Sequence, residues 1–332
     1  MTRIIKQNRI NPFKEIYQIC NRGNSRDKLK QLPIFPRYID VELTNACNFR
    51  CLFCPTGNFS QTRKKGVMNN NVYFKILSDT KNYLTPIRLV RWGEPTMHPN
   101  IIKYIRTAKE LGLMCHITTN GSLLDDDKID DLINVQLDSI KFSFQGVDAK
   151  SYMEMRNINF YDELLEVIQC FSKKRGNRKL PYLHVSTSVT YESKELIDNF
   201  KAVFSKFADL VTVARTEFEY VDPIKVKLGK EAINTLKRLK EQESVVKKHR
   251  ECPEVFDKLS INWDGTVSAC CGDFDDKMVV GDIKKNSLKE IWDSDKMNFY
   301  RRMIVNMRHD ELDLCKSCYY CHGTQTPGLQ KT

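Results

Sequence analysis

Hydrophobic residues in the first two thirds of the chain follow two alternating spacings. Short apolar runs, which are typical of buried parallel strands, alternate with segments whose apolar residues recur every three or four positions. Ile101, Ile105 and Ala108, for example, share one face of a predicted helix. The strand-like runs are residues 39–44, 87–92, 114–119, 139–144, 182–189 and 210–216. Because a helix or a helical linker follows each run, the pattern predicts a parallel sheet with helices outside it.

Six strands are too few to close an eight-stranded TIM barrel, so we expect an α/β fold in the form of an open, partial (β/α)6 TIM-like barrel. The rhythm stops after residue 217, and residues 225–250 have the spacing of a basic amphipathic helix. Residues 259–267 alternate around Asp264-Gly265, a typical hairpin turn, and residues 288–304 predict a helix. The expected domains are a basic extension at 1–37, the barrel at 38–220, a helical linker at 221–250 and a small C-terminal domain at 251–332.

Length and composition restrict the class of protein. The chain has 332 residues, of which 41% are hydrophobic and 29% are charged, so it can build a substantial core. It contains no run of about 18 apolar residues, the length that a membrane-spanning helix requires. Residues 1–20 lack the apolar block and the small-residue cleavage site of a secretory signal. We therefore expect a protein without a transmembrane segment that stays in the cytoplasm.

The net charge of +11 is concentrated near the amino terminus. Residues 1–37 contain nine Lys or Arg residues against Glu15 and Asp27, which gives this extension a charge of +7. The extension is either a solvated basic arm or a surface for an anionic partner. Such a partner would be an acidic electron donor of the flavodoxin or ferredoxin type, a phosphorylated or nucleotide-linked substrate, or an anionic membrane face.

The chain contains 12 cysteines, which need an explanation because structural disulfides are rare in a reducing compartment. Three of them, Cys47, Cys51 and Cys54, form an early group. Six others fall in the last quarter of the chain: Cys252, Cys270, Cys271, Cys315, Cys318 and Cys321. This grouping favours two metal or redox sites.

The early cysteines have the spacing C-x3-C-x2-C and directly follow the first predicted strand, in the segment VELTNACNFRCLFCPTGN. A structural zinc ion usually has four protein ligands, whereas a [4Fe–4S] cluster held by three cysteines leaves one iron open. Loops at the carboxyl ends of parallel strands also form the active sites of barrel enzymes. The pattern therefore favours an open cluster, with a zinc knuckle that takes a fourth ligand from elsewhere as the alternative.

The arrangement C-x3-C-x-aromatic-C, formed by Cys47, Cys51, Phe53 and Cys54, resembles the signature of the radical S-adenosylmethionine (SAM) superfamily. The resemblance implies that the three cysteines hold a [4Fe–4S] cluster whose open iron chelates the amino and carboxylate groups of SAM. It also implies that Phe53 lies against the adenine. Such an enzyme reduces SAM to methionine and a 5′-deoxyadenosyl radical, which abstracts hydrogen from an unactivated C–H bond. The cofactor thus supplies the difficult chemistry.

Further elements that resemble this family follow in the expected order, over about residues 36–220. Gly93-Glu94-Pro95 ends the second strand and resembles the GGEP element, which hydrogen-bonds the SAM amino group, although Trp92 replaces the first glycine. A carboxylate at that position suits an ammonium ligand electrostatically. After the third strand, Thr118-Thr119-Asn120-Gly121 resembles the T-N-G turn of the family.

Two more matches involve the carboxylate and ribose of SAM. Ser143-Phe144-Gln145-Gly146 follows the fourth strand and resembles the S-x-D-G element. Gln145 replaces the acid, so a neutral amide must make any hydrogen bond there. Arg156 resembles an arginine that pairs with the SAM carboxylate in related enzymes, and a solvated helix arginine is the alternative.

The C-terminal cysteines resemble those of the SPASM and shortened "twitch" domains that follow many radical SAM barrels. Cys252, Gly265 and Cys270 fit C-x12-G-x4-C, and Cys315 and Cys318 form C-x2-C. The intervals of 18, 45 and 3 residues are similar to those of a twitch-type dehydrogenase with one auxiliary cluster. By this resemblance, the four cysteines hold a second [4Fe–4S] cluster. A zinc ribbon is the alternative for this tail.

Cys271 and Cys321 remain after this assignment. One of them is an alternate ligand or a buried thiol, or it donates a hydrogen atom to a substrate radical, as in radical SAM epimerases. The resemblance implies oxidation of a secondary alcohol on a polar small molecule, such as a sugar or an aminocyclitol, with the auxiliary cluster as electron acceptor. An epimerase and a peptide-modifying maturase are the alternatives. A zinc-dependent nucleic-acid binder would leave the GEP element unexplained, so we expect no nucleic-acid partner.

Overall fold

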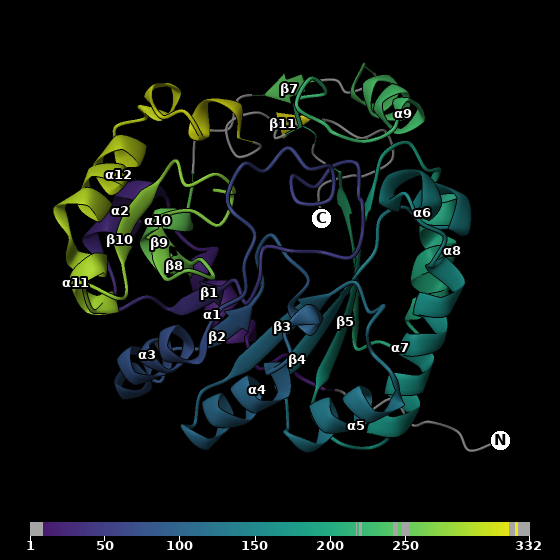
Figure 1. The fold of residues 1–332 in the computed structure, drawn as a ribbon, viewed down its shortest axis with the longest axis horizontal. Helices are drawn as coiled ribbons and strands as arrows, with labels where there is room; N and C mark the ends of the chain where they lie inside the picture. Colours follow the sequence, from purple (N-terminus) through teal and green to yellow (C-terminus); the bar gives the residue numbers. More distant parts are fainter. Residues whose placement is uncertain are drawn as a thin grey trace.

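The structure is a computed structural model that describes residues 9–216, 218, 221–241, 245–247, 252–318 and 323–324. Six parallel strands form the centre of one sheet, in the order of the sequence. They are β1 (Tyr38–Val41), β2 (Ile87–Leu89), β3 (Cys115–Thr119), β4 (Ser139–Ser143), β5 (Tyr182–Val189) and β6 (Leu210–Arg215). All six predicted strands are therefore confirmed, and β1 and β2 end earlier than predicted. The sheet curves around an open interior, as a partial barrel does (Figure 1).

Helices cover the outer face of the sheet (Figure 1). They are α3 (Asn70–Thr80), α4 (Ile101–Glu110), α5 (Asp126–Asn134), α6 (Ala149–Arg156), α7 (Tyr161–Arg175) and α8 (Lys194–Phe204). Polar side chains fix several of their first turns by accepting backbone N–H groups. Asn69, Asp125, Asp148 and Ser193 do so at the starts of α3, α5, α6 and α8. The short 3-10 helices η1 (Lys81–Tyr83) and η2 (Pro95–Met97) flank β2.

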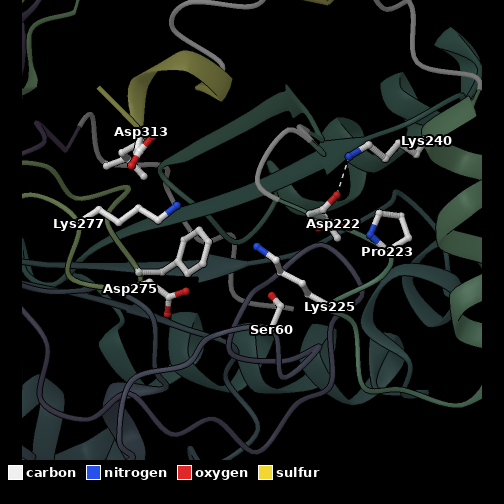
Figure 2. Close-up of a pocket in the computed structure, with 11 residues that line it drawn as sticks. Ser60, Asp222, Pro223, Lys225, Lys240, Asp275, Lys277 and Asp313 are labelled. Atoms are coloured by element: carbon white, nitrogen blue, oxygen red, sulfur yellow. Dashed lines mark hydrogen bonds between the residues drawn. The ribbon is translucent and has the colours of Figure 1, made fainter. Parts of the chain in front are cut away.

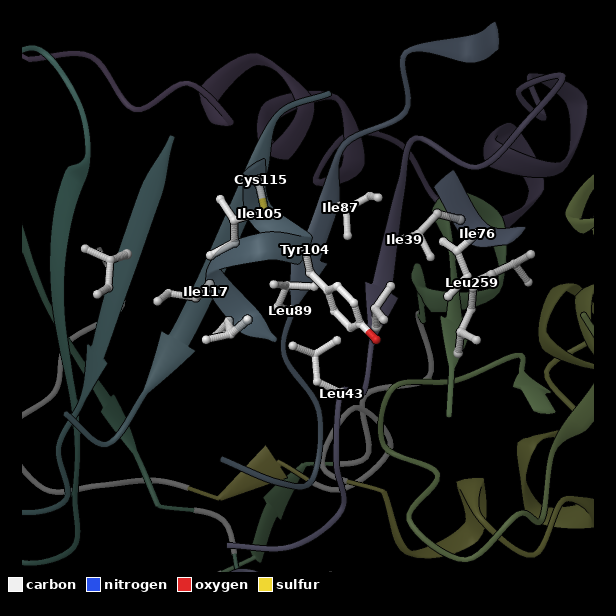
Figure 3. Packing of buried hydrophobic residues seen from close by; sticks show 14 of the residues in the cluster. Ile39, Leu43, Ile76, Ile87, Leu89, Tyr104, Ile105, Cys115, Ile117 and Leu259 are labelled. Atoms are coloured by element: carbon white, nitrogen blue, oxygen red, sulfur yellow. The ribbon is translucent and has the colours of Figure 1, made fainter. Parts of the chain in front are cut away.

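The core lies between the sheet and these helices. Alternate residues of the strands, such as Ile39, Ile87 and Ile117, are fully buried and pack against Ile105 of α4 and its neighbours (Figure 3). The intervening positions carry polar side chains. Arg88 of β2, for example, donates to the carboxylate of Asp40 in β1 at 2.7 Å.

The C-terminal region extends this sheet beyond β1. β8 (Lys258–Ile261) pairs with β1 in parallel, and β9 (Thr266–Ser268) and β10 (Val279–Asp282) continue in antiparallel register. The predicted hairpin at Asp264-Gly265 is confirmed, because Gly265 has a φ of +92°, which favours glycine. The expected small C-terminal domain therefore shares one nine-stranded sheet with the barrel.

Two predicted helices differ from the structure. The single helix predicted at 288–304 is two helices, α11 (Leu288–Asp293) and α12 (Asp295–Val305). Ser294 separates them in an extended conformation and accepts the Met297 N–H as the cap of α12. The linker helix α9 (Lys230–Glu241) is shorter than the predicted 225–250. Past it, β7 (Val245–Lys247) pairs with β11 (Gly323–Thr324), because β-branched residues favour a strand there.

The basic extension packs onto the barrel from residue 9 onward, so this part is not a solvated arm. It contains α1 (Lys14–Cys20) and α2 (Ser25–Lys30). Phe13 is fully buried, and Arg9 pairs with Asp209 at 3.3 Å. Lys28 pairs with Asp257 at the end of α10 (Glu254–Asp257). None of the described helices is long and apolar enough to cross a membrane.

Candidate active site

The early cysteines lie on the long loop that follows β1, at the carboxyl edge of the parallel strands. The thiol of Cys51 is buried, and those of Cys47 and Cys54 are partly buried. The Phe49 N–H donates to the Cys47 sulfur at 3.4 Å. This is the edge at which barrel enzymes place their chemistry.

The three early thiols lie close enough to influence one another. Burial, with contributions from the neighbouring Cys51 and Cys54, raises the pKa of Cys47 to about 12. Burial also raises the pKa of Cys54, and Cys51 contributes. A bound cation would oppose these shifts and favour the thiolate forms of Cys47 and Cys54. An iron centre would act in this way, because a coordinating thiol loses its proton to the metal.

Arg156 reaches this loop from the last turn of α6. Its Nη1 donates to the Cys51 sulfur at 3.5 Å, and its Nη2 donates to the Ser143 hydroxyl at 3.0 Å. The side chain is buried, with an exposed fraction of 5%. Its Nε has no hydrogen-bond partner among the described residues. The alternative of a solvated helix arginine is therefore wrong, and a buried cation faces the cysteine loop.

The GEP element contacts the cysteine loop through its backbone. A Cβ atom at Gly93 would lie 1.9 Å from the carbonyl oxygen of Thr44, which no side chain could tolerate. The Glu94 N–H donates to the carbonyl of Ala46 at 2.9 Å. Pro95 then begins η2. Glycine is thus required at position 93 because two loops touch there.

The carboxylate of Glu94 is almost fully buried and accepts hydrogen bonds from the following turns. Its Oε1 accepts from the Thr96 and Thr119 hydroxyls at 2.6 and 2.7 Å. Its Oε2 accepts from the Asn120 N–H at 2.8 Å. Burial raises the pKa of Glu94, and these hydrogen bonds oppose that shift. Glu94 therefore holds the T-N-G turn against the cysteine loop, a role that the sequence did not predict.

We expect a Glu94→Ala variant to bind SAM more weakly, by about 1–3 kcal/mol, because it loses charge-assisted hydrogen bonds that fix the turn. Equilibrium dialysis of the anaerobically reconstituted protein with SAM would measure the dissociation constant. Glu110→Ala, an exposed change at the end of α4, is the control and should leave this constant unchanged. An equal constant in Glu94→Ala and wild type would contradict this role.

The remaining sequence-predicted residues lie around the same edge. The Asn120 side chain donates to Asn48 at 2.9 Å and lies 3.9 Å from the Cys47 sulfur. Gln145 is buried, and its amide donates to the Thr216 hydroxyl at 3.3 Å. Phe53 packs against both hydrophobic clusters. The residues predicted for SAM thus come together at one edge of the sheet.

The four C-terminal cysteines assigned to the second set also come together. Burial raises the pKa of Cys252, with contributions from Cys318 and Cys315. The pKa of Cys270 is raised by its hydrogen bond with Cys271, by burial and by Cys252. Cys315 begins the short helix η4 (Cys315–Ser317), which follows η3 (His309–Glu311). This set therefore joins residues up to 66 positions apart, from 252 to 318.

Cys271 lies beside this set and contacts a charged pair. Its thiol donates to the carboxylate of Glu254 at 3.0 Å, and Glu254 pairs with Lys258 at 2.5 Å. Cys321 lies outside the described residues. Cys271 thus lies where an alternate ligand could act, and the same role for Cys321 stays a prediction.

Neither cysteine set has the geometry of a zinc site. Among the residues that the structure describes, no three His, Cys, Asp or Glu side chains lie close enough together to hold one metal ion. A structural zinc ion needs four ligands that converge on one point. A four-iron cluster needs wider spacing, because each cysteine binds a different iron. The donor numbers, three thiols in the first set and four in the second, are those of an open and a fully ligated four-iron cluster.

Contacts that the sequence did not predict connect the two cysteine regions. Arg63, on the loop after Cys54, donates to both carboxylate oxygens of Glu42 at 2.9 and 2.7 Å. Its Nε donates to the carbonyl of Phe274 at 2.8 Å. Arg91 donates to the carbonyl of Asp273 at 2.6 Å. No local motif in the sequence predicts these long-range contacts. The two arginines, one beside the cysteine loop and one beside the GEP element, are only a weak sign of buried ion pairs or hydrogen bonds.

A cavity of about 290 Å³ is lined by residues from several of these loops (Figure 2). Its walls come from the loop after Cys54, the segment 221–225, α9, the loop after Cys271 and the residues just before Cys315. The charged residues that line it are Asp222, Lys225, Lys240, Asp275, Lys277 and Asp313. The cavity is thus polar, and its walls include segments that neighbour both groups of cysteines in the sequence.

Comparisons with known proteins agree with this geometry. The Radical SAM superfamily model matches residues 41–207, and the model of an iron-sulfur cluster-binding domain, SPASM, matches residues 252–319. These two domains imply iron–sulfur clusters and SAM as cofactors.

Relatives cover most of the chain. A tungsten-containing aldehyde ferredoxin oxidoreductase cofactor-modifying protein of Pyrococcus furiosus is 25% identical, over 88% of this chain and 91% of the relative. The SAM-dependent 2-deoxy-scyllo-inosamine dehydrogenase of Niallia circulans is 22% identical, over 84% of this chain and 91% of the relative. The crystal structure of Streptococcus suis SuiB bound to SAM matches with a TM-score of 0.65 at 17% identity, over 93% of this chain and 78% of SuiB. The structural match supports the fold.

Proposed function

The chain belongs to the radical SAM superfamily, and from this premise we propose that it oxidises a secondary alcohol on a polar small molecule, such as a sugar or an aminocyclitol. One observation carries the proposal. The walls of the polar cavity include the loop that follows Cys54 and the segments next to Cys271 and Cys315 in the sequence, so we propose that a substrate bound there lies between the two cysteine sets. The similarity to a SAM-dependent dehydrogenase of a small cyclitol supports the same reaction.

The two cysteine sets fit the two roles that this oxidation needs, hydrogen abstraction and electron acceptance. Cys47, Cys51 and Cys54 would hold the SAM-binding cluster, and Arg156 would place a positive charge beside it for the SAM carboxylate. When bound, SAM and the clusters would supply a 5′-deoxyadenosyl radical at the first set and an electron acceptor at the second. The second ligand set would be Cys252, Cys270, Cys315 and Cys318. We thus propose two [4Fe–4S] clusters.

The proposed oxidation balances as the removal of two electrons and two protons from the substrate. One hydrogen atom leaves the carbinol carbon and ends in 5′-deoxyadenosine. One proton leaves the hydroxyl group, and one electron leaves the remaining carbon radical, which gives a ketone. The chain contributes position and exclusion of water. An acidic flavodoxin or ferredoxin as the external electron donor stays a prediction from the net charge.

An epimerase would need a cysteine that returns a hydrogen atom to the substrate radical. No cysteine is among the described residues that line the cavity, and the Cys271 thiol donates to Glu254. Cys321, the other candidate hydrogen donor, lies outside the described residues, so the epimerase stays the alternative that the deuterium experiment below tests. The size of the cavity favours a small molecule over the peptide of a maturase, because about 290 Å³ lies near the lower end of small-molecule pockets.

We expect the product formed in D2O to carry no deuterium at the oxidised carbon and to be two mass units lighter than the substrate. The reason is that a ketone forms without any hydrogen returning to that carbon. The test incubates the reconstituted enzyme with SAM, reductant and a panel of sugars, aminocyclitols and their phosphate esters, followed by mass spectrometry. A product with one deuterium at an inverted carbon would instead identify an epimerase.

A further inference from the structure

The cavity also indicates which chemical group anchors the substrate. We propose that Lys225 and Lys277, with the Ser60 hydroxyl, bind a phosphate group of the substrate, as a phosphate ester or a diphosphate. This inference rests on the proposed function, since it identifies the substrate class of the same site. Three sets of observations support it: the contacts of the two lysines, the contacts of the carboxylates in the cavity, and the burial of the Ser60 hydroxyl.

The two lysines extend into the cavity from different parts of the chain (Figure 2). Lys225 comes from the segment that follows β6, and Lys277 comes from the loop between β9 and β10. No carboxylate among the described residues forms a salt bridge with either ammonium group, and neither donates a hydrogen bond to the described residues. Their charges are therefore available to an anion. Lysine is a common phosphate-binding residue because its ammonium group acts as a point charge.

The three carboxylates of the cavity are already engaged. Asp222 accepts the Ile224 N–H at 3.0 Å, and Asp275 accepts the Thr62 N–H at 2.7 Å. Asp313 pairs with Lys316 at 2.6 Å. These contacts fix the carboxylates on their own loops. The hydrogen bond with Lys316 lowers the pKa of Asp313, and Lys277 also contributes, so Lys277 and Asp313 interact electrostatically without forming a salt bridge.

Ser60 supplies a buried donor in the cavity wall. Only 7% of the residue is exposed, and its hydroxyl oxygen has no hydrogen-bond partner among the described residues. A buried hydroxyl without a partner costs free energy, so a ligand atom would restore its hydrogen bond. The Ser60 backbone is held in place, because its N–H donates to the Asn58 side chain at 3.0 Å.

The segment that carries Lys225 is fixed to the rest of the site. The Lys227 N–H donates to the Asn58 carbonyl at 2.9 Å. Lys240 of α9 donates to the Val221 and Phe218 carbonyls at 2.5 and 3.2 Å. Lys240 therefore helps to hold the segment that carries Lys225 in the cavity wall. Two ammonium groups and one hydroxyl match a dianion with several acceptor oxygens.

The test uses the anaerobically reconstituted holoenzyme without reductant, so that no turnover occurs. Calorimetric titration with inorganic pyrophosphate and with inorganic orthophosphate should detect binding to the wild type. The double variant Lys225→Glu/Lys277→Glu should weaken it by at least about tenfold, because two charge-assisted contacts are lost. Tighter pyrophosphate binding would indicate a diphosphate substrate, and tighter orthophosphate binding would indicate a phosphate monoester.

Two further variants make the result specific. Lys225→Arg/Lys277→Arg should retain binding, since arginine keeps the charge. Lys201→Glu/Lys237→Glu changes the net charge equally at exposed helix positions outside the cavity, and it should bind like the wild type. Iron content and circular dichroism would verify that each variant is folded.

Three results would overturn the inference: no phosphate binding by the wild type, unchanged binding in the Lys225→Glu/Lys277→Glu variant, or an equal loss in the control on the helices. Because the titration measures binding without turnover, it is independent of the reaction type. If the holoenzyme binds pyrophosphate and its product carries deuterium, the phosphate-binding inference holds and the proposed dehydrogenase is rejected.

Discussion

A Cys51→Ala variant is expected to form no 5′-deoxyadenosine above background when SAM and dithionite are supplied. The reason lies in the ligand count, because a cluster held by three cysteines cannot keep its open iron after one ligand is lost. The variant also removes the sulfur that Arg156 contacts at 3.5 Å. Liquid chromatography of the quenched reaction would measure 5′-deoxyadenosine directly, without knowledge of the substrate.

The chain offers a matched control for this experiment. Cys170 lies on α7, and its thiol contacts Asp126 at 3.5 Å on the outer surface of the barrel. A Cys170→Ala variant should cleave SAM at the wild-type rate. Wild-type cleavage in Cys51→Ala would reject the assignment of the first cysteine set, whereas loss in both variants would point to a general sensitivity to cysteine replacement.

The second large effect concerns the C-terminal cysteine set. A Cys315→Ala/Cys318→Ala variant should contain about four fewer iron atoms per chain and form little or no oxidised product, because the substrate radical would lack its electron acceptor. SAM cleavage should continue at a reduced rate, uncoupled from product formation. Iron analysis, 5′-deoxyadenosine assay and product assay on the same sample would separate these quantities.

This double variant tests the two-cluster proposal as well as the reaction. Full product formation would show that the second set is not needed for the reaction, and unchanged iron would show that these cysteines hold no cluster. The single variant Cys318→Ser keeps a weaker ligand in place and should retain part of the iron. Cys170→Ala again serves as the control, with iron equal to the wild type.

The sequence predicted most of the barrel because its signals are local. Buried parallel strands leave apolar runs in the sequence, and helices leave a period of about 3.6 residues. The cysteine spacing and the GEP element are also local signals, and each directly follows a predicted parallel strand. Because parallel strands end at the same edge of a sheet, the sequence predicted that these two elements lie close together. The break at Ser294 was missed because a serine between two apolar turns is also compatible with one longer helix.

Other features depend on contacts between distant segments, which spacing alone cannot predict. The pairing of Arg63 with Glu42 and Phe274 joins residues more than 200 positions apart. The packing of Phe13 under the barrel is of the same kind, since a single aromatic residue in a basic segment has no evident partner. The cavity residues Lys225 and Lys277 were ordinary surface lysines in the sequence. The fold places both lysines in the wall of one cavity, which the sequence could not predict.

The parallel pairing of β8 with β1 makes the two halves of the molecule inseparable. Lys258 of β8 is almost fully buried and pairs with Asp40 of β1 at 3.5 Å, so removal of the C-terminal region would leave a buried carboxylate with one cation fewer. It would also leave β1 as an unprotected edge, with N–H and C=O groups free to pair with another chain. A barrel truncated before residue 252 should therefore aggregate, which light scattering of the purified fragment beside the intact chain would measure.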